Sequence, residues 1–297
     1  MSLTQEQLKR FNQEGYVVIR SALQDTDIEQ VIQDYEEIID KLARDLLAAG
    51  RISHLYENEP FETRLARICD EDEATYFASD QFLDVGHVRG KGTFNFMRNQ
   101  RLLDLVESVI GPEISCSPMT HIRAKLPSDL GRGRSSNIVS WHQDAIFLHQ
   151  EADQTFILTV WLPLCNTMEE NGCLRIMPRI HKNRTVYWDN SLPNETAVTV
   201  PMKRGDVVFI HKLTPHSSGP NQTDAIRWSM DIRYQKQGTP SGRSFWPGFD
   251  ARSRLKPDSE TSYETWQDYW IIALEKYPKK VPRKNRPNKP LPYQGEM

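Results

Sequence analysis

A short run of side chains near the middle of the chain has the donor types that hold a redox-active metal ion. The run is Trp141-His142-Gln143-Asp144, and a further histidine, His216, follows far downstream. Two imidazoles and one carboxylate suit an Fe(II) centre that keeps coordination positions open for a co-substrate and O2. His142 and Asp144 are two positions apart, so in an extended strand both side chains point to the same side and can reach one ion. The third ligand must then come from a distant strand.

Two histidines stand where that third ligand is needed. His211 ends the apolar run 206–210, and His216 lies just beyond it in a turn rich in Ser, Gly, Pro and Asn. We favour His216, because its turn leads into the strand that carries Arg227, whereas a histidine that ends an apolar strand is more typical of packing. His211 remains the alternative ligand.

The segment 227–234 alternates between polar and apolar side chains. Its polar positions are Arg227, Ser229, Asp231 and Arg233, and its apolar positions are Trp228, Met230, Ile232 and Tyr234. This period of two predicts a strand with one face toward solvent or a ligand. Arg227 presents a rigid fork of donors that matches a carboxylate, so we expect it to anchor a dicarboxylic co-substrate near the metal.

An isolated His-x-Asp is common by chance, but several further motifs accompany this one in a characteristic order. They are Leu3–Gln7 through Phe11 to Gly15–Ile19, the metal-binding run 141–144, Glu170–Pro178 with His181, Gly205–Phe209, and the stretch from His216 to Arg227. Together, over residues 3 to 235, they resemble the phytanoyl-CoA dioxygenase family of Fe(II)- and 2-oxoglutarate-dependent oxygenases. Where the family usually reads Pro-Gly-Ser-His, this chain has Pro178-Arg179-Ile180-His181, a departure that affects a turn and no ligand.

The resemblance implies a set of roles for individual residues. His142, Asp144 and His216 would be the iron ligands. Arg227, with Ser218, would hold the distal carboxylate of 2-oxoglutarate, and Gln143 and Trp161 fall where relatives contact this co-substrate. The implied cofactors are Fe(II), 2-oxoglutarate and O2, with ascorbate as a supporting reductant. The implied reaction oxidises a substrate C–H bond and releases succinate and CO2.

The outcome of that oxidation is not determined by these motifs. Halogenating relatives have a small residue at the position of Asp144, which vacates a coordination position for chloride, so we expect no halogenation. Hydroxylation of a small organic substrate in specialised-metabolite tailoring is the favoured outcome. Desaturation, epimerisation, endoperoxide formation and acyl hydroxylation of the phytanoyl-CoA type remain open. A cupin-like metal-binding sensor without turnover is the alternative outside enzymes, although it has no use for the anchor formed by Arg227 and Ser218.

Hydrophobic periodicity predicts an α+β, mainly β fold with a double-stranded β-helix core, a cupin-like jelly roll, flanked by N-terminal helices. Helices are expected from Thr4 to Gly15 and from Thr26, with Glu29 completing a capping box, to Gly50. Expected strands, besides Tyr16–Ile19 and Arg227–Tyr234, are Thr120–Leu126, Ile138–Asp144, Phe156–Leu164, Leu174–Met177, Ala197–Pro201 and Val207–Ile210. The expected organisation is one catalytic domain over 1–297, with helical and β support in 1–113, the jelly roll in 114–235 and an aromatic, then basic and proline-rich extension in 236–297.

Composition agrees with a soluble, most simply cytoplasmic enzyme. We further expect a small-molecule substrate, no nucleic-acid or membrane partner, and a monomer or homodimer. The 297 residues carry a net charge of -3, which argues against a nucleic-acid partner. No run approaches the length of an apolar membrane span, and the first residues lack the character of a signal peptide. The four cysteines lack metal-ligand spacing. Loop 127–137 is either a lid over the site or an ordinary surface loop, and the aromatics of 266–270 indicate packing or a subunit interface more than a substrate cage.

Overall fold

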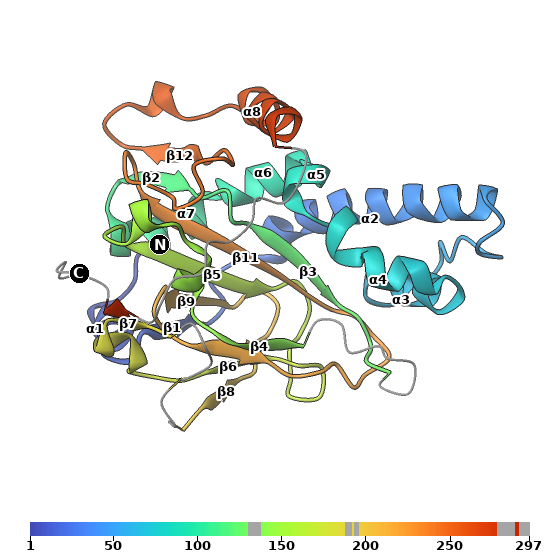
Figure 1. The fold of residues 1–297 in the computed structure, drawn as a ribbon, viewed down its shortest axis with the longest axis horizontal. Coiled ribbons are helices and arrows are strands. Elements are labelled where there is room, and N and C mark those ends of the chain that lie inside the picture. Colours follow the sequence, from blue (N-terminus) through green and yellow to red (C-terminus); the bar gives the residue numbers. More distant parts are fainter. Residues whose placement is uncertain (130–137, 188–191, 193–195, 278–288, 291–297) are drawn as a thin grey trace.

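Two antiparallel β-sheets face each other, and helices cover the outer face of the larger one (Figure 1). The computed structural model of the chain describes residues 1–129, 138–187, 192, 196–277 and 289–290. The segment 130–137 and most of the basic C-terminal segment, on which two of the expectations above fall, lie outside these described residues. The arrangement is the expected jelly roll with flanking helices.

The larger sheet has seven strands in the order β1-β9-β5-β11-β2-β12, with β3 also paired to β11. Its strands are β1 (Tyr16–Ile19), β2 (Glu113–Cys116), β3 (His121–Lys125), β5 (Ile157–Pro163), β9 (Val207–His211), β11 (Arg227–Lys236) and β12 (Phe249–Ser253). The smaller sheet has four strands in the order β4-β10-β6-β8. They are β4 (Val139–His142), β6 (Leu174–Ile176), β8 (Val198–Val200) and β10 (His216–Ser218), and β7 (Thr185–Val186) pairs separately with β13 (Lys289–Pro290).

Eight α-helices lie among the described residues. They are α1 (Gln5–Glu14), α2 (Asp25–Ala48), α3 (Phe61–Glu71), α4 (Glu73–Phe82), α5 (Val85–Val88), α6 (Lys91–Met97), α7 (Gln100–Ile110) and α8 (Tyr263–Lys276). The Thr4–Gln7 capping box begins α1 and Gly15, in the left-handed conformation, ends it, as expected. The second helix differs at its start, because Gln24 and Asp27 form the capping box that was expected at Thr26 and Glu29. None of the described helices is long and apolar enough to cross a membrane.

Strand β11 joins the helical layer to the space between the sheets. Its apolar side chains, Trp228, Met230, Ile232 and Tyr234, are fully buried in the main hydrophobic core with α2, α3 and α6. Trp228 stacks on Phe61 of α3 with ring centroids 4.5 Å apart. The polar side chains of the same strand therefore face the opposite way, toward the smaller sheet, as the alternation predicts.

The C-terminal aromatics contribute to this core. Trp266 of α8 packs against Phe94 and Phe249, with ring centroids 5.2 and 6.1 Å away, and Trp270 packs against Trp246 at 5.4 Å. Tyr269, which lies between Trp266 and Trp270 in the sequence of α8, is 43% exposed. Core packing, and not a substrate cage, accounts for Trp266 and Trp270.

A buried hydroxyl links the sheet to the helices and can be tested directly. The Tyr234 hydroxyl donates to the Met97 carbonyl oxygen at 2.8 Å in the core. Tyr234→Phe should lower the free energy of unfolding by about 1 kcal/mol, because this carbonyl loses a buried donor. Urea unfolding measures the change, and Tyr269→Phe on the exposed side of α8 should leave it unaltered. Equal stability of both variants would show that the Tyr234 bond contributes nothing net.

Candidate active site

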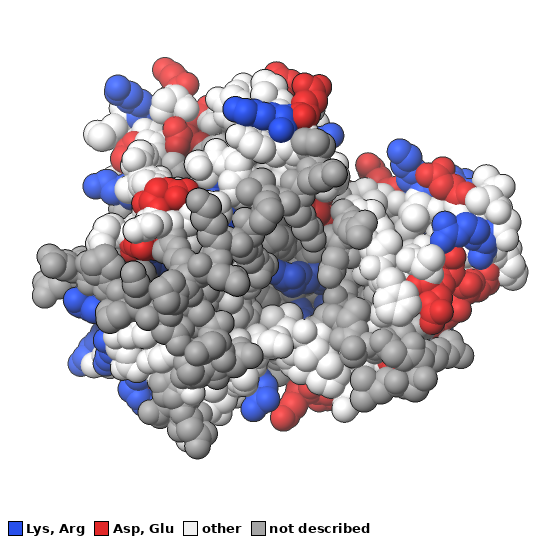
Figure 2. All heavy atoms as spheres, in the orientation of Figure 1, with Lys and Arg blue, Asp and Glu red and all other residues white. Residues whose placement is uncertain are grey.

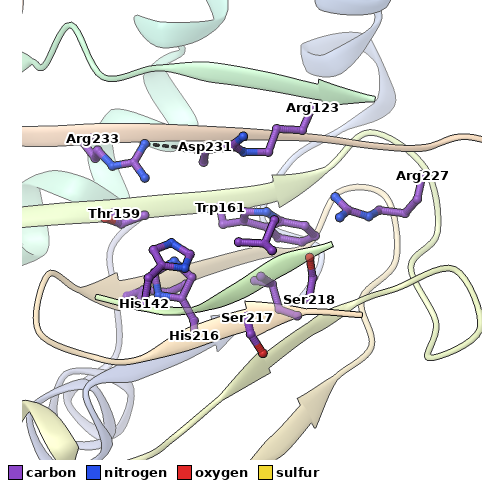
Figure 3. Close-up of a pocket in the computed structure, with 13 residues that line it drawn as sticks. Arg123, His142, Thr159, Trp161, His216, Ser217, Ser218, Arg227, Asp231 and Arg233 are labelled. Atoms are coloured by element: carbon purple, nitrogen blue, oxygen red, sulfur yellow. Dashed lines mark hydrogen bonds and ion pairs between the residues drawn. The ribbon is translucent and has the colours of Figure 1, made fainter. Parts of the chain in front are cut away.

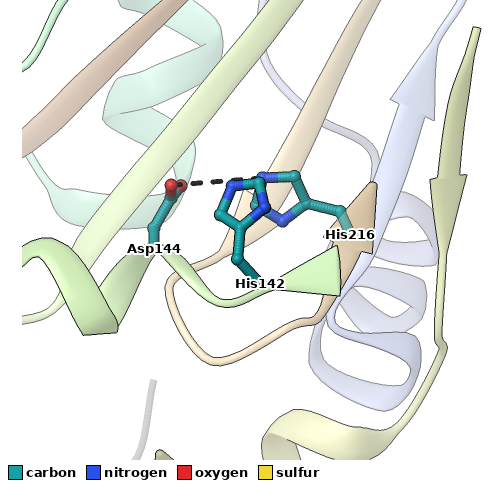
Figure 4. A group of neighbouring side chains, drawn as sticks. All are labelled: His142, Asp144 and His216. Atoms are coloured by element: carbon teal, nitrogen blue, oxygen red, sulfur yellow. Dashed lines mark ion pairs between the residues drawn. The ribbon is translucent and has the colours of Figure 1, made fainter. Parts of the chain in front are cut away.

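The two histidines and the carboxylate meet at the edge of the smaller sheet. Strands β4 and β10 pair so that His142 and His216 are direct partners, and their ring centroids are 4.3 Å apart. Asp144 lies just beyond β4, at the start of the short 3-10 turn Asp144–Phe147. One ligand atom from each of the three residues lies within 4.8 Å of the others (Figure 4). They are the one group of this kind among the described residues.

Backbone carbonyls orient both imidazoles. The Nδ1 atom of His142 lies 2.9 Å from the Ser140 carbonyl oxygen, and that of His216 lies 3.1 Å from the Thr214 carbonyl oxygen. A carbonyl only accepts, so each Nδ1 carries the proton and donates it, which leaves the Nε2 lone pair for a metal. Burial, aided by the nearby His216, lowers the pKa of His142 to about 4, so its ring is neutral at ordinary pH. The donor set and its tautomers fit a divalent transition metal.

Asp144 is held by two side chains that sequence reasoning missed. Arg233 of β11 donates from Nη2 to one carboxylate oxygen at 2.7 Å, and the Thr159 hydroxyl of β5 donates to the other. Burial by itself raises the pKa of the Asp144 carboxyl, but the positive charge of Arg233 outweighs it and holds the pKa far below its usual range. Asp144 is therefore an ionised ligand in a fixed orientation.

Arg233 belongs to a longer run of paired charges. It also donates to Asp231, which in turn accepts from Nε of Arg123 on β3 at 3.0 Å. Asp231 and Arg233 are both at most 5% exposed at their side chains. The alternation of β11 was the available signal, since it placed Asp231 and Arg233 on the same face as Arg227. Their partners, Arg123 on β3 and Asp144 after β4, cannot be predicted from the sequence of β11 alone.

Arg227 lies on the same face of β11, farther along the cavity (Figure 3). It is 2% exposed, its guanidinium lies over the Trp161 ring at 5.6 Å, and it donates to the Ser229 hydroxyl. No carboxylate among the described residues pairs with it, and its Nε has no hydrogen-bond partner there. Burial lowers the pKa of Arg227 to about 10, which leaves it charged at neutral pH. A buried unpaired cation is costly, so this position calls for an anion.

The expected residues divide into those that face one cavity and those that do not. His142, Trp161, His216, Ser218 and Arg227 line the same cavity between the sheets. Its remaining lining residues are Arg123, Val139, Thr159, Leu174, Ile210, Ser217, Asp231 and Arg233. Asp144 reaches it through its contact with His216, whose Nε2 lies 4.0 Å from the carboxylate.

Gln143 does not line this cavity, in contrast to its expected place beside the co-substrate. Its side-chain amide donates to the carbonyl oxygens of Thr185 and Leu213, at 3.0 and 2.7 Å, and accepts from the Tyr187 backbone N–H at 2.9 Å. Gln143 thus ties the turn between the two ligands to neighbouring loops.

His211 also lies apart from the cluster. It is on β9, its ring packs against Phe156 and His181 with centroids 5.5 and 5.2 Å away, and its Nδ1 accepts from the Leu213 backbone N–H at 3.0 Å. Burial lowers its pKa to about 3. This placement is that of a packed histidine.

Comparison with known proteins identifies the family of this chain. The family model described as phytanoyl-CoA dioxygenase (PhyH) matches residues 11–229. Human peroxisomal phytanoyl-CoA dioxygenase is 26% identical over 252 residues, which cover 78% of this chain and 68% of the human protein. Methylphosphonate hydroxylase of Gimesia maris is 26% identical over 243 residues, covering 78% of this chain and 81% of that protein.

Solved structures share the fold. The epimerase SnoN, in complex with Fe3+, alpha ketoglutarate and nogalamycin RO, superposes with a TM-score of 0.55 at 21% identity, covering 81% of this chain and 87% of SnoN. A non-heme monooxygenase, the ThoJ-Ni complex, has a TM-score of 0.57 at 20% identity, covering 90% of this chain and 96% of that one. The chain therefore belongs to the phytanoyl-CoA dioxygenase family and is an Fe(II)- and 2-oxoglutarate-dependent oxygenase.

Proposed function

We propose that this enzyme hydroxylates an unactivated C–H bond of a small organic substrate and converts 2-oxoglutarate and O2 to succinate and CO2. The observation that carries the proposal is that two members of the metal-binding cluster, His142 and His216, line one cavity with Arg227, which pairs with no carboxylate in the described part of the chain. A metal binder without turnover has no need of a second, anion-binding end. A dicarboxylate that bridges the metal and a guanidinium fits both ends.

Each side chain has a separate task in this proposal. His142, Asp144 and His216 hold Fe(II), which when bound supplies the activation of O2 that couples decarboxylation of 2-oxoglutarate to oxidation of the substrate. Arg227 binds the distal carboxylate of 2-oxoglutarate, and Ser218 adds a hydroxyl donor at the same end of the cavity. Trp161 lies under the Arg227 guanidinium and keeps water from this end.

The remaining polar residues fix the metal carboxylate. Arg233 and Thr159 each occupy one side of Asp144, so the carboxylate cannot rotate away from the two imidazoles. Such support from surrounding residues is what keeps ligands in a productive geometry. Asp144 also fills the coordination position that a halogenating enzyme leaves to chloride, which favours oxygen transfer.

The test is turnover with oxygen labelled by its heavy isotope. Enzyme, Fe(II), 2-oxoglutarate and labelled O2 should give succinate that carries one labelled oxygen, even if slowly in the absence of the true substrate. Asp144→Ala is the control and should give none. Tight Fe(II) binding without any succinate would favour the metal-binding sensor. Desaturation and epimerisation share the succinate, and the labelled oxygen in the organic product separates hydroxylation from both.

Arg227→Gln should raise the dissociation constant for 2-oxoglutarate about a hundredfold. The variant loses charge-assisted hydrogen bonds worth about 3 kcal/mol, and each 1.4 kcal/mol is about a factor of ten. Titration of the anaerobic Fe(II) enzyme with 2-oxoglutarate measures this, and Fe(II) binding itself should be unaffected. Arg175→Gln, on an exposed position of β6, is the matched control. Unchanged 2-oxoglutarate binding in Arg227→Gln would remove Arg227 from the site.

A further inference from the structure

We propose that the prime substrate carries a terminal oxyanion, a carboxylate or a phosphonate, and that Arg123 binds it at the side of the cavity between β3 and β4. The proposal rests on the function proposed above. It names a substrate class and a specificity residue that the metal ligands and Arg227 do not determine.

The cavity holds more positive than negative charge. Three guanidiniums line it, those of Arg123, Arg227 and Arg233. The guanidinium of Arg233 is already paired, since it donates to both Asp144 and Asp231. Arg227 faces the distal carboxylate of 2-oxoglutarate. Arg123 is the remaining cation of the lining.

Arg123 has hydrogen-bond donors that no described residue engages. Only its Nε is engaged, at 3.0 Å from Asp231, and no described residue accepts from its two terminal amino groups. Asp231 is itself shared, because it also accepts from Arg233 on its other oxygen. The Arg123 side chain is 41% exposed, so its terminal groups can reach an incoming ligand. A planar fork with two free amino groups is suited to a bidentate oxyanion.

Charge balance in the loaded site leads to the same residue. Fe(II) with ionised Asp144 leaves one positive charge, and Arg227 adds a second, which the two carboxylates of 2-oxoglutarate neutralise. Asp231 cancels one of the two charges of Arg123 and Arg233. One net positive charge, shared by Arg123 and Arg233 around Asp231, is then left over in a partly buried cavity, where excess charge is unfavourable. A substrate with one negative charge completes the balance.

A neighbouring lysine does not change this account. Lys125 is the cross-strand partner of Arg227 but is not part of the cavity lining, and it donates to the Gly219 carbonyl oxygen at 2.8 Å. Burial lowers the pKa of Lys125 to about 6, so it adds little positive charge at neutral pH.

The position of Arg123 suits a substrate better than a co-substrate. Among the described residues β3 pairs only with β11, and β4 only with β10, so both strands are edges of their sheets, and each contributes a residue to the cavity lining, Arg123 and Val139. In Figure 3, Arg123 lies on β3, whereas Trp161 comes from β5 and Arg227 from β11. Figure 2 shows lysine or arginine atoms at the bottom of a hollow, over the part of Figure 1 where β3 and β11 lie. Val139 and Leu174 supply apolar wall for a hydrocarbon portion.

The experiment uses the full chain loaded with Fe(II) and saturating 2-oxoglutarate under anaerobic conditions. Hexanoate, hexylphosphonate and the uncharged hexanamide are titrated separately, and the change in the Fe(II)-2-oxoglutarate absorption band reports binding. At least one acid should bind about tenfold or more tightly than the amide, as expected for a charge-assisted pair. The carboxylate and phosphonate arms show which oxyanion the site prefers.

Substitutions of Arg123 test whether this residue causes the preference for acids over the amide. Arg123→Gln should weaken acid binding about tenfold or more while the dissociation constant of 2-oxoglutarate stays within about threefold. Arg123→Lys should retain only part of the acid binding, because it keeps the charge but loses the bidentate fork. Arg44→Gln, on the exposed face of α2, is the matched control. Equal binding of acids and amide, or unchanged acid binding in Arg123→Gln, would overturn the proposal. Loss of 2-oxoglutarate binding in that variant would also overturn it, by assigning Arg123 to the co-substrate. A wild-type enzyme without the absorption band contradicts the proposed function instead.

Discussion

His216→Ala should abolish Fe(II) binding, and succinate formation with it, whereas His211→Ala should leave both intact. Removing His216 leaves two ligands on one short segment and none from β10, which is too few for tight binding of a catalytic iron. The His216 side chain otherwise makes one hydrogen bond to the described residues, to the Thr214 carbonyl oxygen, so the fold should tolerate its loss. Anaerobic equilibrium dialysis with Fe(II) measures the binding.

The two histidines make a well-matched pair for this comparison. Both are buried, and both end or begin a strand bordering the same short loop. His211→Ala should cost some stability through lost contacts with Phe156 and His181, and thermal unfolding separates that cost from metal binding. Loss of iron from His211→Ala but not from His216→Ala would show that the third ligand is wrongly assigned.

Arg233→Met should destabilise the metal-free protein by about 3–5 kcal/mol at neutral pH, because Asp144 and Asp231 would face each other in the interior without the cation between them. Urea unfolding measures the loss. Arg20→Met is the matched control, since its pair with Asp206 is 58% exposed on the arginine side and should contribute less than about 1 kcal/mol.

The effect of Arg233→Met should depend on pH in one direction. The pKa of both carboxyls is held below the usual range in the wild type, against the opposing effect of burial. Their ionised forms therefore contribute stability above the ordinary aspartate pKa of about 4, and this contribution is lost as pH falls. The difference between wild type and variant should shrink below about pH 4. A difference that is constant with pH would indicate lost packing and not lost charge pairing.

Local patterns predicted the parts of the molecule that depend on one segment. The alternation of 227–234 placed Trp228 in the core and Arg227 in the cavity, and the apolar spacing of 28–42 predicted α2. The expected strand Ile138–Asp144 ends earlier, at His142, because Asp144 begins a 3-10 turn. The helices of 51–113 were predicted only as a group, although capping residues separate them, such as Asn99 at the start of α7 and Gly111 at its end.

Several contacts between distant segments were not predicted from the sequence. Arg233 of the larger sheet binds Asp144, which follows β4 of the smaller sheet, and Arg123 binds Asp231 because β3 pairs with β11. Neither contact follows from the sequence of one strand. The placement of Gln143 came from resemblance and conflicts with alternation, since a residue between two inward-pointing ligands points the other way. Its amide indeed serves backbone groups outside the cavity.

The most direct test of the central claim is the absorption spectrum of the anaerobic protein with Fe(II) and 2-oxoglutarate. A site built from His142, Asp144, His216 and Arg227 predicts a weak metal-to-ligand charge-transfer band that needs both additions and disappears on exposure to air as succinate forms. Fe(II) binding without any such band on addition of 2-oxoglutarate would contradict the account.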